Sequence, residues 1–386
     1  GPAPPIGAVG ARVAEKEDRT QDQALVRARS SCSMILWIPL HGGSSRATLP
    51  DVSRFAEEWY ETRVPRTRKE LRSSGVGRRA IAGPGFEPTS HGYHRRAGPE
   101  QRSTPTQRIV DALPLVPDGG FVAGWAAAYV HGVNALDGLD PHTLAPLPVP
   151  IVLPPGLRRR DTATVTYRQS SRRARGELVN DIPVTSTWRT IFDLTRHAPD
   201  LTEAVVAVDA FLAARLVTRD VLERTIARTP PGHRGVRQAR AAIGLARPGV
   251  ASTWETRLRI FAVTELGWTD LEPNRAVFDL TGQLLGVPDL LQVESALAIE
   301  YDGASWSSGR RHGHRDRDQH REDNAREERL ERAGLVVVRV DKADVAQHRS
   351  AMAERLRAAQ ADGLGRDRSR DRWTLEEPAH WIGLPA

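Results

Sequence analysis

Two carboxylates in the C-terminal third have the types and spacing to do chemistry. Asp289 follows Pro288 in a predicted strand, and Glu300 lies eleven residues on in the next predicted strand. A tight hairpin would bring the two side chains together. Carboxylates clustered on an apolar strand repel each other and are costly to desolvate unless a cation compensates. Mg²⁺ prefers a few carboxylate oxygens and keeps waters for phosphate chemistry. The pair therefore predicts a Mg²⁺ site, with Mn²⁺ as an alternative ion, whose ligands are Asp289 and Glu300.

Two further acids occur in the predicted elements. Asp302 shares a strand face with Glu300, because strand side chains alternate between two faces. The Asp302-Gly303 dipeptide is also typical of a turn, which would give Asp302 only a structural role. Glu255 opens a predicted helix. It lies three residues after Ser252, which also fits a purely structural capping box.

The elements that must position these side chains follow the order α, β, β, β, α, β. This order is read from apolar periodicity and from turn residues between the apolar runs. The predicted elements are a helix from Ser252 to Gly267, strands over 276–278, 284–291 and 297–301, a helix over about 319–332 and a strand over 335–340.

The segment PDLLQVESALAIEYDG resembles the PD-(D/E)xK nuclease motif. The wider sequence, roughly residues 60 to 350, is similar to an actinobacterial family whose C-terminal domain is related to very-short-patch-repair endonucleases. The N-terminal part of such proteins resembles the winged-helix region of abortive-infection antitoxins. The resemblance implies a restriction-endonuclease-like domain that cleaves DNA with a metal ion. It also implies Asp289 and Glu300 as metal ligands and Glu255 as the acid of the first helix.

The chain departs from this motif at one position. The lysine expected two residues after Glu300 is Asp302, and Arg321 or His320 on the following helix is the candidate replacement. The catalytic candidates are therefore Glu255, Asp289, Glu300, Asp302 and Arg321. Two functions follow: a Mg²⁺-dependent DNA endonuclease, or a non-catalytic DNA-binding regulator or antitoxin-like protein that keeps the fold. A histidine- and aspartate-rich segment over 312–320 has metal-ligand types but no fixed ligand spacing.

Charge and composition favour an anionic partner and exclude several classes. Of the 55 basic residues only three are lysines, and arginine guanidinium groups bind phosphate bidentately. The net charge of +7 favours DNA, although 48 acidic residues interleave with the arginines. The single cysteine, Cys32, excludes an intramolecular disulfide framework. No apolar run approaches the roughly 18 residues of a membrane span. We expect a cytoplasmic protein that binds DNA and no membrane, and the sequence leaves a toxin or other protein partner open.

Composition and periodicity also divide the chain. The expected class is α/β (α+β), with a mainly helical α+β region before the endonuclease-like αβββαβ core. The 51–105 segment has an alternative interpretation as a solvated basic linker. The predicted parts are an extension without stable structure over 1–50, a degenerate winged-helix region over 51–105, a central α+β domain over 106–249, the endonuclease-like domain over 250–350, and a C-terminal helix and tail over 351–386.

Overall fold

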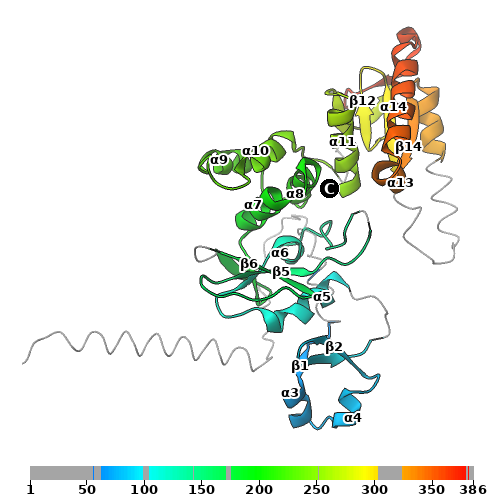
Figure 1. Ribbon diagram of the computed structural model, residues 1–386. Coiled ribbons are helices and arrows are strands. Elements are labelled where there is room, and N and C mark those ends of the chain that lie inside the picture. Colours follow the sequence, from blue (N-terminus) through cyan, green and yellow to red (C-terminus); the bar gives the residue numbers. More distant parts are fainter. Residues whose placement is uncertain are drawn as a thin grey trace, which may run out of the picture. The chain divides into compact units, whose positions relative to one another are not determined.

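The computed structural model, shown in Figure 1, has a mixed α+β architecture, as the sequence predicts. The described part of the chain contains four β-sheets. None of the described helices is long and apolar enough to cross a membrane. The extension predicted over 1–50 lies outside the described residues. These are residues 55, 62–98, 104–141, 143–170, 175–250, 252–302, 324–379 and 381.

Residues 62–98 fold into a small unit with two helices and a three-stranded antiparallel sheet of order β1-β3-β2. The first helix begins with a capping box, in which Thr67 and Glu70 satisfy each other's backbone N–H groups. A solvated linker is therefore the wrong interpretation of 62–98. The elements are β1 (Arg66–Thr67), α3 (Arg68–Ser73), α4 (Arg78–Ile81), β2 (Phe86–Ser90) and β3 (Tyr93–Arg96).

Helix α5 (Pro105–Ala112) joins this unit to the rest of the chain through polar contacts. The Asp111 carboxylate lies 3.2 Å from Nε of Arg95 on β3, and the Gln107 side chain hydrogen-bonds the backbone N–H and C=O of Arg63. Burial raises the pKa of Asp111 to about 6, more than the charge of Arg95 lowers it. Asp111 therefore binds its proton more tightly in the folded state.

This raised pKa predicts how stability depends on pH. The folded-state pKa lies above the ordinary value, so the contribution of Asp111 is fully present below about pH 4 and is lost as the pH rises through 6. As the pH rises, the wild type should lose about 1–2 kcal/mol of unfolding free energy through Asp111, allowing for solvent screening. Asp111→Asn should not show this loss. Thermal or urea unfolding of both proteins between pH 4 and 7 measures it. Parallel curves for the two proteins would contradict the assignment.

The central region is built on a five-stranded mixed sheet of order β6-β5-β4-β8-β7. Strands β7 and β8 form a hairpin that the sequence analysis missed. Its two-residue turn, Asn180-Asp181, has φ of 49° and 61°, the left-handed values of a type I′ turn. The elements are η1 (Leu113–Leu115), β4 (Phe121–Val122), α6 (Gly124–Val130), β5 (Val149–Leu153), β6 (Val165–Gln169), β7 (Gly176–Val179) and β8 (Ile182–Thr185).

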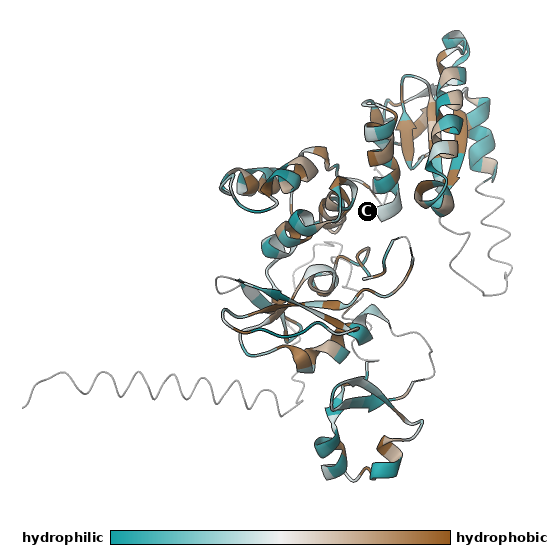
Figure 2. Ribbon diagram, viewed as in Figure 1, coloured by the Kyte–Doolittle hydropathy of each residue, from teal (hydrophilic) through white to brown (hydrophobic). Residues whose placement is uncertain are grey.

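Four helices follow the sheet, in the region that the sequence predicts to be mainly helical. Helix α8 is apolar nearly all round, because α7, α10 and α11 all pack on it. Figure 2 shows the brown apolar residues along these helices. The helices are α7 (Thr187–His197), α8 (Leu201–Ala213), α9 (Arg219–Ala227) and α10 (Val236–Leu245).

The C-terminal region has a four-stranded sheet of order β14-β13-β12-β9, in which β13 and β14 are parallel and the other neighbours antiparallel. A helix over 324–332 precedes β14. A second sheet has the order β11-β10-β15. The remaining bounds are α11 (Thr253–Glu265), β9 (Leu271–Pro273), β10 (Val277–Asp279), β11 (Leu284–Gly286), β12 (Leu290–Gln292), β13 (Leu297–Asp302), β14 (Val336–Asp341), α13 (Lys342–Ala346), α14 (Arg349–Leu364), η2 (Arg368–Arg370) and β15 (Trp373–Thr374).

One predicted strand is wrong in its extent. The run over 284–291 is two strands, β11 and β12, which lie in different sheets. Pro288 lies between them and has no N–H to donate to a ladder. In the main sheet β12 pairs with β9, a strand that the sequence analysis did not predict. The predicted strand over 276–278 does not take this place. The hairpin of β12 and β13 is present as predicted, with Leu291 opposite Ala298.

Helix α11 belongs to two hydrophobic cores at once. Ile260 packs with α7, α8 and α10, whereas Leu258 and Phe261 pack with the C-terminal sheet. Arg259 forms a buried ion pair with Asp209 of α8, at 2.7 Å. Removing either partner of such a pair leaves a buried charge, which costs about 3–5 kcal/mol. The predicted boundary at 249/250 therefore precedes a helix fixed to the central region.

Candidate carboxylate site of the C-terminal sheet

Asp289 and Glu300 lie at the same part of the β12–β13 hairpin. Asp289 immediately precedes β12, and its Oδ2 accepts a 2.6 Å hydrogen bond from the backbone N–H of Tyr301. Glu300 is the residue before Tyr301 on β13, and its side chain is mostly buried. The structure thus places both predicted metal ligands at one end of the sheet.

Arg326, on the helix over 324–332, supplies a basic side chain to this site. Its Nη2 lies 3.0 Å from Oε2 of Glu300, and its charge acts to lower the pKa of Asp289. A Cβ on Gly286 would lie 3.1 Å from Cγ of Arg326, so the glycine leaves room for the arginine stem. The charged neighbours of Arg326 on this helix would by themselves favour a solvated face. Arg326 lies four residues before the fully buried Leu330, and that spacing could have placed it on the inner face.

Asn274 links Glu255 to Asp289 by hydrogen bonds. The Glu255 side chain is buried, and its Oε2 accepts a 2.9 Å hydrogen bond from Nδ2 of Asn274. The backbone N–H of Asn274 donates to the carbonyl oxygen of Asp289, at 3.2 Å. Ser252 also caps the backbone N–H of Glu255, so Glu255 has the expected place at the helix start and a side-chain contact within the site. Asn274 was not a sequence candidate.

The electrostatics of Asp289 favour a bound cation. Burial and the nearby charge of Glu255 together raise its pKa to about 6, against the hydrogen bond from Tyr301 and the charge of Arg326, which lower it. A desolvated carboxylate beside another carboxylate is relieved by a cation or a proton. The oxygen donors suit Mg²⁺, which is commonly held by one or two carboxylates and several waters.

The other predicted residues have different outcomes. Asp302 is exposed at the end of β13, and its Cα pairs with that of Asp341 on β14. Arg321 and His320 lie outside the described residues, as does the histidine-rich segment over 312–320. Within the described ranges no three His, Cys, Asp or Glu side chains form a group that could hold a metal.

Comparison with known proteins leaves the family open. No family model matches the chain, and no curated protein matches it. The crystal structure of the RV2827C protein from Mycobacterium tuberculosis is similar over 50% of this chain and 75% of that chain, with 16% identity and a TM-score of 0.30. A likeness at this level shows neither the fold nor the function of the present chain.

Proposed function

We propose that the protein is a Mg²⁺-dependent DNA endonuclease with a restriction-endonuclease-like C-terminal domain. The observation that carries the proposal is the half-buried carboxylate of Asp289, which is close enough to Glu255 and to Arg326, the partner of Glu300, for both charges to shift its pKa. Acids and an arginine at one sheet end suit phosphodiester hydrolysis, in which negative charge develops on the phosphate.

The residues take separate roles in this proposal. Asp289 and Glu300 would hold the ion, which supplies activation of water and screening of phosphate charge when bound. Asn274 fixes Glu255 relative to Asp289 through its two hydrogen bonds. Arg326 would contact the phosphate and stabilise its developing charge, the role that the motif assigns to lysine.

The charge distribution supports DNA as the partner. Residues 62–98 contain nine Lys or Arg and two Asp or Glu, an excess of seven that equals the net charge of the whole chain. Arg78 and Arg79 are exposed on α4, and the hairpin of β2 and β3 follows them. A helix followed by a two-stranded wing with this charge suits binding of the DNA backbone.

This surface predicts a salt-dependent change in DNA affinity. The double variant Arg78→Gln/Arg79→Gln should bind duplex DNA more weakly. The slope of log K against log salt should become shallower by about 2, because each lost phosphate contact releases about one counterion fewer. Fluorescence anisotropy between about 50 and 200 mM salt measures both. The control is Arg224→Gln/Arg228→Gln, which changes two exposed arginines, one on α9 and one at its C-terminal cap. Equal slopes for the two double variants would contradict the assignment.

The proposed activity is tested by cleavage of supercoiled plasmid with the full chain. Nicked or linear product should form with Mg²⁺ or Mn²⁺ and not with EDTA. The variants Asp289→Asn and Glu300→Gln exclude a contaminating nuclease, because they must lose the product. Absence of product with either ion, while the protein still binds DNA, would overturn the proposal.

A second function, a non-catalytic DNA-binding regulator or antitoxin-like protein, is favoured by Asp302. This residue adds a negative charge where the motif has lysine. A regulator should bind DNA with an affinity that is independent of Mg²⁺ and should leave plasmid intact. Such a protein would use residues 62–98 for DNA and the C-terminal sheet for a partner such as a toxin.

A further inference from the structure

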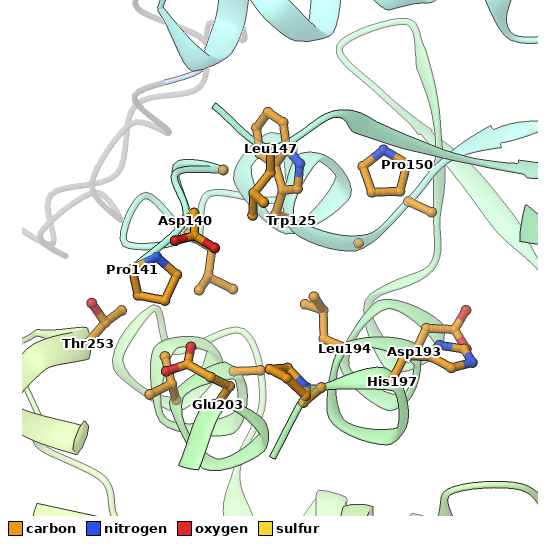
Figure 3. A pocket seen from close by; sticks show the side chains of 18 of the residues that line it. Trp125, Asp140, Pro141, Leu147, Pro150, Asp193, Leu194, His197, Glu203 and Thr253 are labelled. Carbon is orange, nitrogen blue, oxygen red and sulfur yellow. The ribbon is translucent and has the colours of Figure 1, made fainter. Parts of the chain in front are cut away.

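A cavity of about 720 Å³ lies apart from the carboxylate site. Its walls come from α6, the segment over 135–147, β5, β6, α7, α8 and the first turn of α11 (Figure 3). A cavity of this size is typical of sites for small organic molecules, which bury most of their surface in such clefts.

One end of the cavity carries an excess of positive charge. Arg189 and Arg196 both pair with Asp193, at 2.6 and 2.8 Å. Arg168 and Arg234 also line the cavity, and neither has an acidic partner within the part of the chain that the structure describes. Arg189 and Arg196 thus share one carboxylate, the charge of Arg168 acts on the neighbouring His197, and Arg234 adds a further positive charge to the cavity lining.

The positive charges at this end also act on the pKa of His197. His197 lies at this end of the cavity beside Asp193 (Figure 3). Burial lowers its pKa, and the charges of Arg196 and Arg168 lower it further. An anion bound here would offset both charges, so it should raise the pKa of His197.

At the opposite end of the cavity the acidic side chains already lie near basic ones. Glu203 accepts two hydrogen bonds from the Arg257 guanidinium, at 2.6 and 2.9 Å. The charge of Asp140 is close enough to Lys342 to raise the pKa of that lysine, against burial and Arg257, which lower it. Figure 3 shows Asp140 and Glu203 on the side away from His197. An anionic group therefore belongs at the arginine end.

The walls between the two ends are apolar and rigid. Trp125 and Leu147 form one wall, and Leu194 lies opposite them (Figure 3). Nε1 of Trp125 donates a 2.9 Å hydrogen bond to the carbonyl oxygen of Pro148, and the Arg108 guanidinium lies 4.6 Å from its ring centroid. The indole is thus held in place and is mostly buried, and only the small part that stays exposed lines the cavity.

We propose that this cavity binds a small organic anion, with its phosphate, sulfonate or carboxylate group at Arg168, Arg196 and Arg234 and its apolar body against Leu147 and Leu194. The interaction combines charge-assisted hydrogen bonds at one end with apolar burial at the other. It requires neither DNA cleavage nor a metal ion.

The probe for the test is 8-anilinonaphthalene-1-sulfonate, which carries a sulfonate on a planar apolar body. The full chain should bind it saturably with a stoichiometry of one and with energy transfer from tryptophan. The double variant Arg168→Gln/Arg234→Gln should weaken binding at least about tenfold, because it removes two charge-assisted contacts. Arg224→Gln/Arg228→Gln, on α9 and at its C-terminal cap, outside the cavity, should bind as the wild type does. Ala207→Leu, which fills space from α8, should also weaken binding.

Several outcomes would overturn the proposal. These are absence of saturable binding, equal affinity of the wild type and the Arg168/Arg234 variant, and displacement of the probe by duplex DNA, which would make this a DNA surface. A readout on the unaltered protein covers variants that fail to fold. The His197 imidazole resonance, assigned with His197→Asn, should titrate at higher pH when the probe is bound. An unchanged titration would also overturn the proposal.

Discussion

Asp289→Asn is expected to lower Mg²⁺-dependent plasmid cleavage by on the order of 10³-fold, the scale of losing a group that acts at the reacting phosphate. The substitution removes the charge that would hold the ion. It keeps an oxygen that can accept the Tyr301 N–H hydrogen bond. The fold should therefore survive. The substitution also removes an ionised carboxylate whose burial is costly at neutral pH, so it should not lower stability. Initial cleavage rates over a range of Mg²⁺ concentrations measure the effect.

Matched variants separate the loss of a ligand from a general change in charge. Glu331→Gln changes an exposed acid near the end of the helix over 324–332 and should cleave as the wild type does. Glu300→Gln should lose cleavage to a similar degree as Asp289→Asn. Glu255→Gln should lose less, because its amide oxygen can still accept from Asn274. Wild-type rates for Asp289→Asn would remove Asp289 from the site.

The hairpin that carries this site was predictable from local sequence. Alternating side chains and the short turn before Leu297 fix the pairing of β12 with β13 without reference to the rest of the chain. The place of Asp289 beside β13 follows from that pairing. Sheet membership was not predictable in the same way, because β9 pairs with residues about twenty positions away, and its three residues give too short a pattern to identify.

The two contacts that complete the site depend on tertiary structure. Arg326 fits a solvated helix face by its charged neighbours, and only packing of the helix against the sheet brings it to Glu300. Asn274 has φ of 50°, a left-handed value that asparagine tolerates, and a turn residue is its ordinary interpretation. Its link between Glu255 and Asp289 joins residues far apart in the chain.

Arg326→Ala is expected to lower cleavage by about 10²–10³-fold, as loss of one group that stabilises developing charge does. The Mg²⁺ concentration that gives half-maximal rate should change little, because Asp289 and Glu300 remain. The control is Arg332→Ala, which removes an exposed arginine from the same helix, paired only with Glu328 in the described residues. Cleavage rates and Mg²⁺ titrations of the two variants measure the difference.

Variants of Arg321 and Asp302 distinguish the assignment of Arg326 as the basic group from the assignment of Arg321 and from an inactive, DNA-binding protein. If Arg321→Ala abolishes cleavage and Arg326→Ala does not, Arg321 is the basic group, as the sequence predicts. If Arg326 has that role, Asp302→Lys should restore part of the activity of Arg326→Ala, because it returns a positive charge to the strand position of the motif lysine. If the wild type is inactive and Asp302→Lys alone cleaves, the negative charge at 302 is what blocks the reaction. The carboxylates would then belong to a nuclease fold that acts as a DNA-binding regulator.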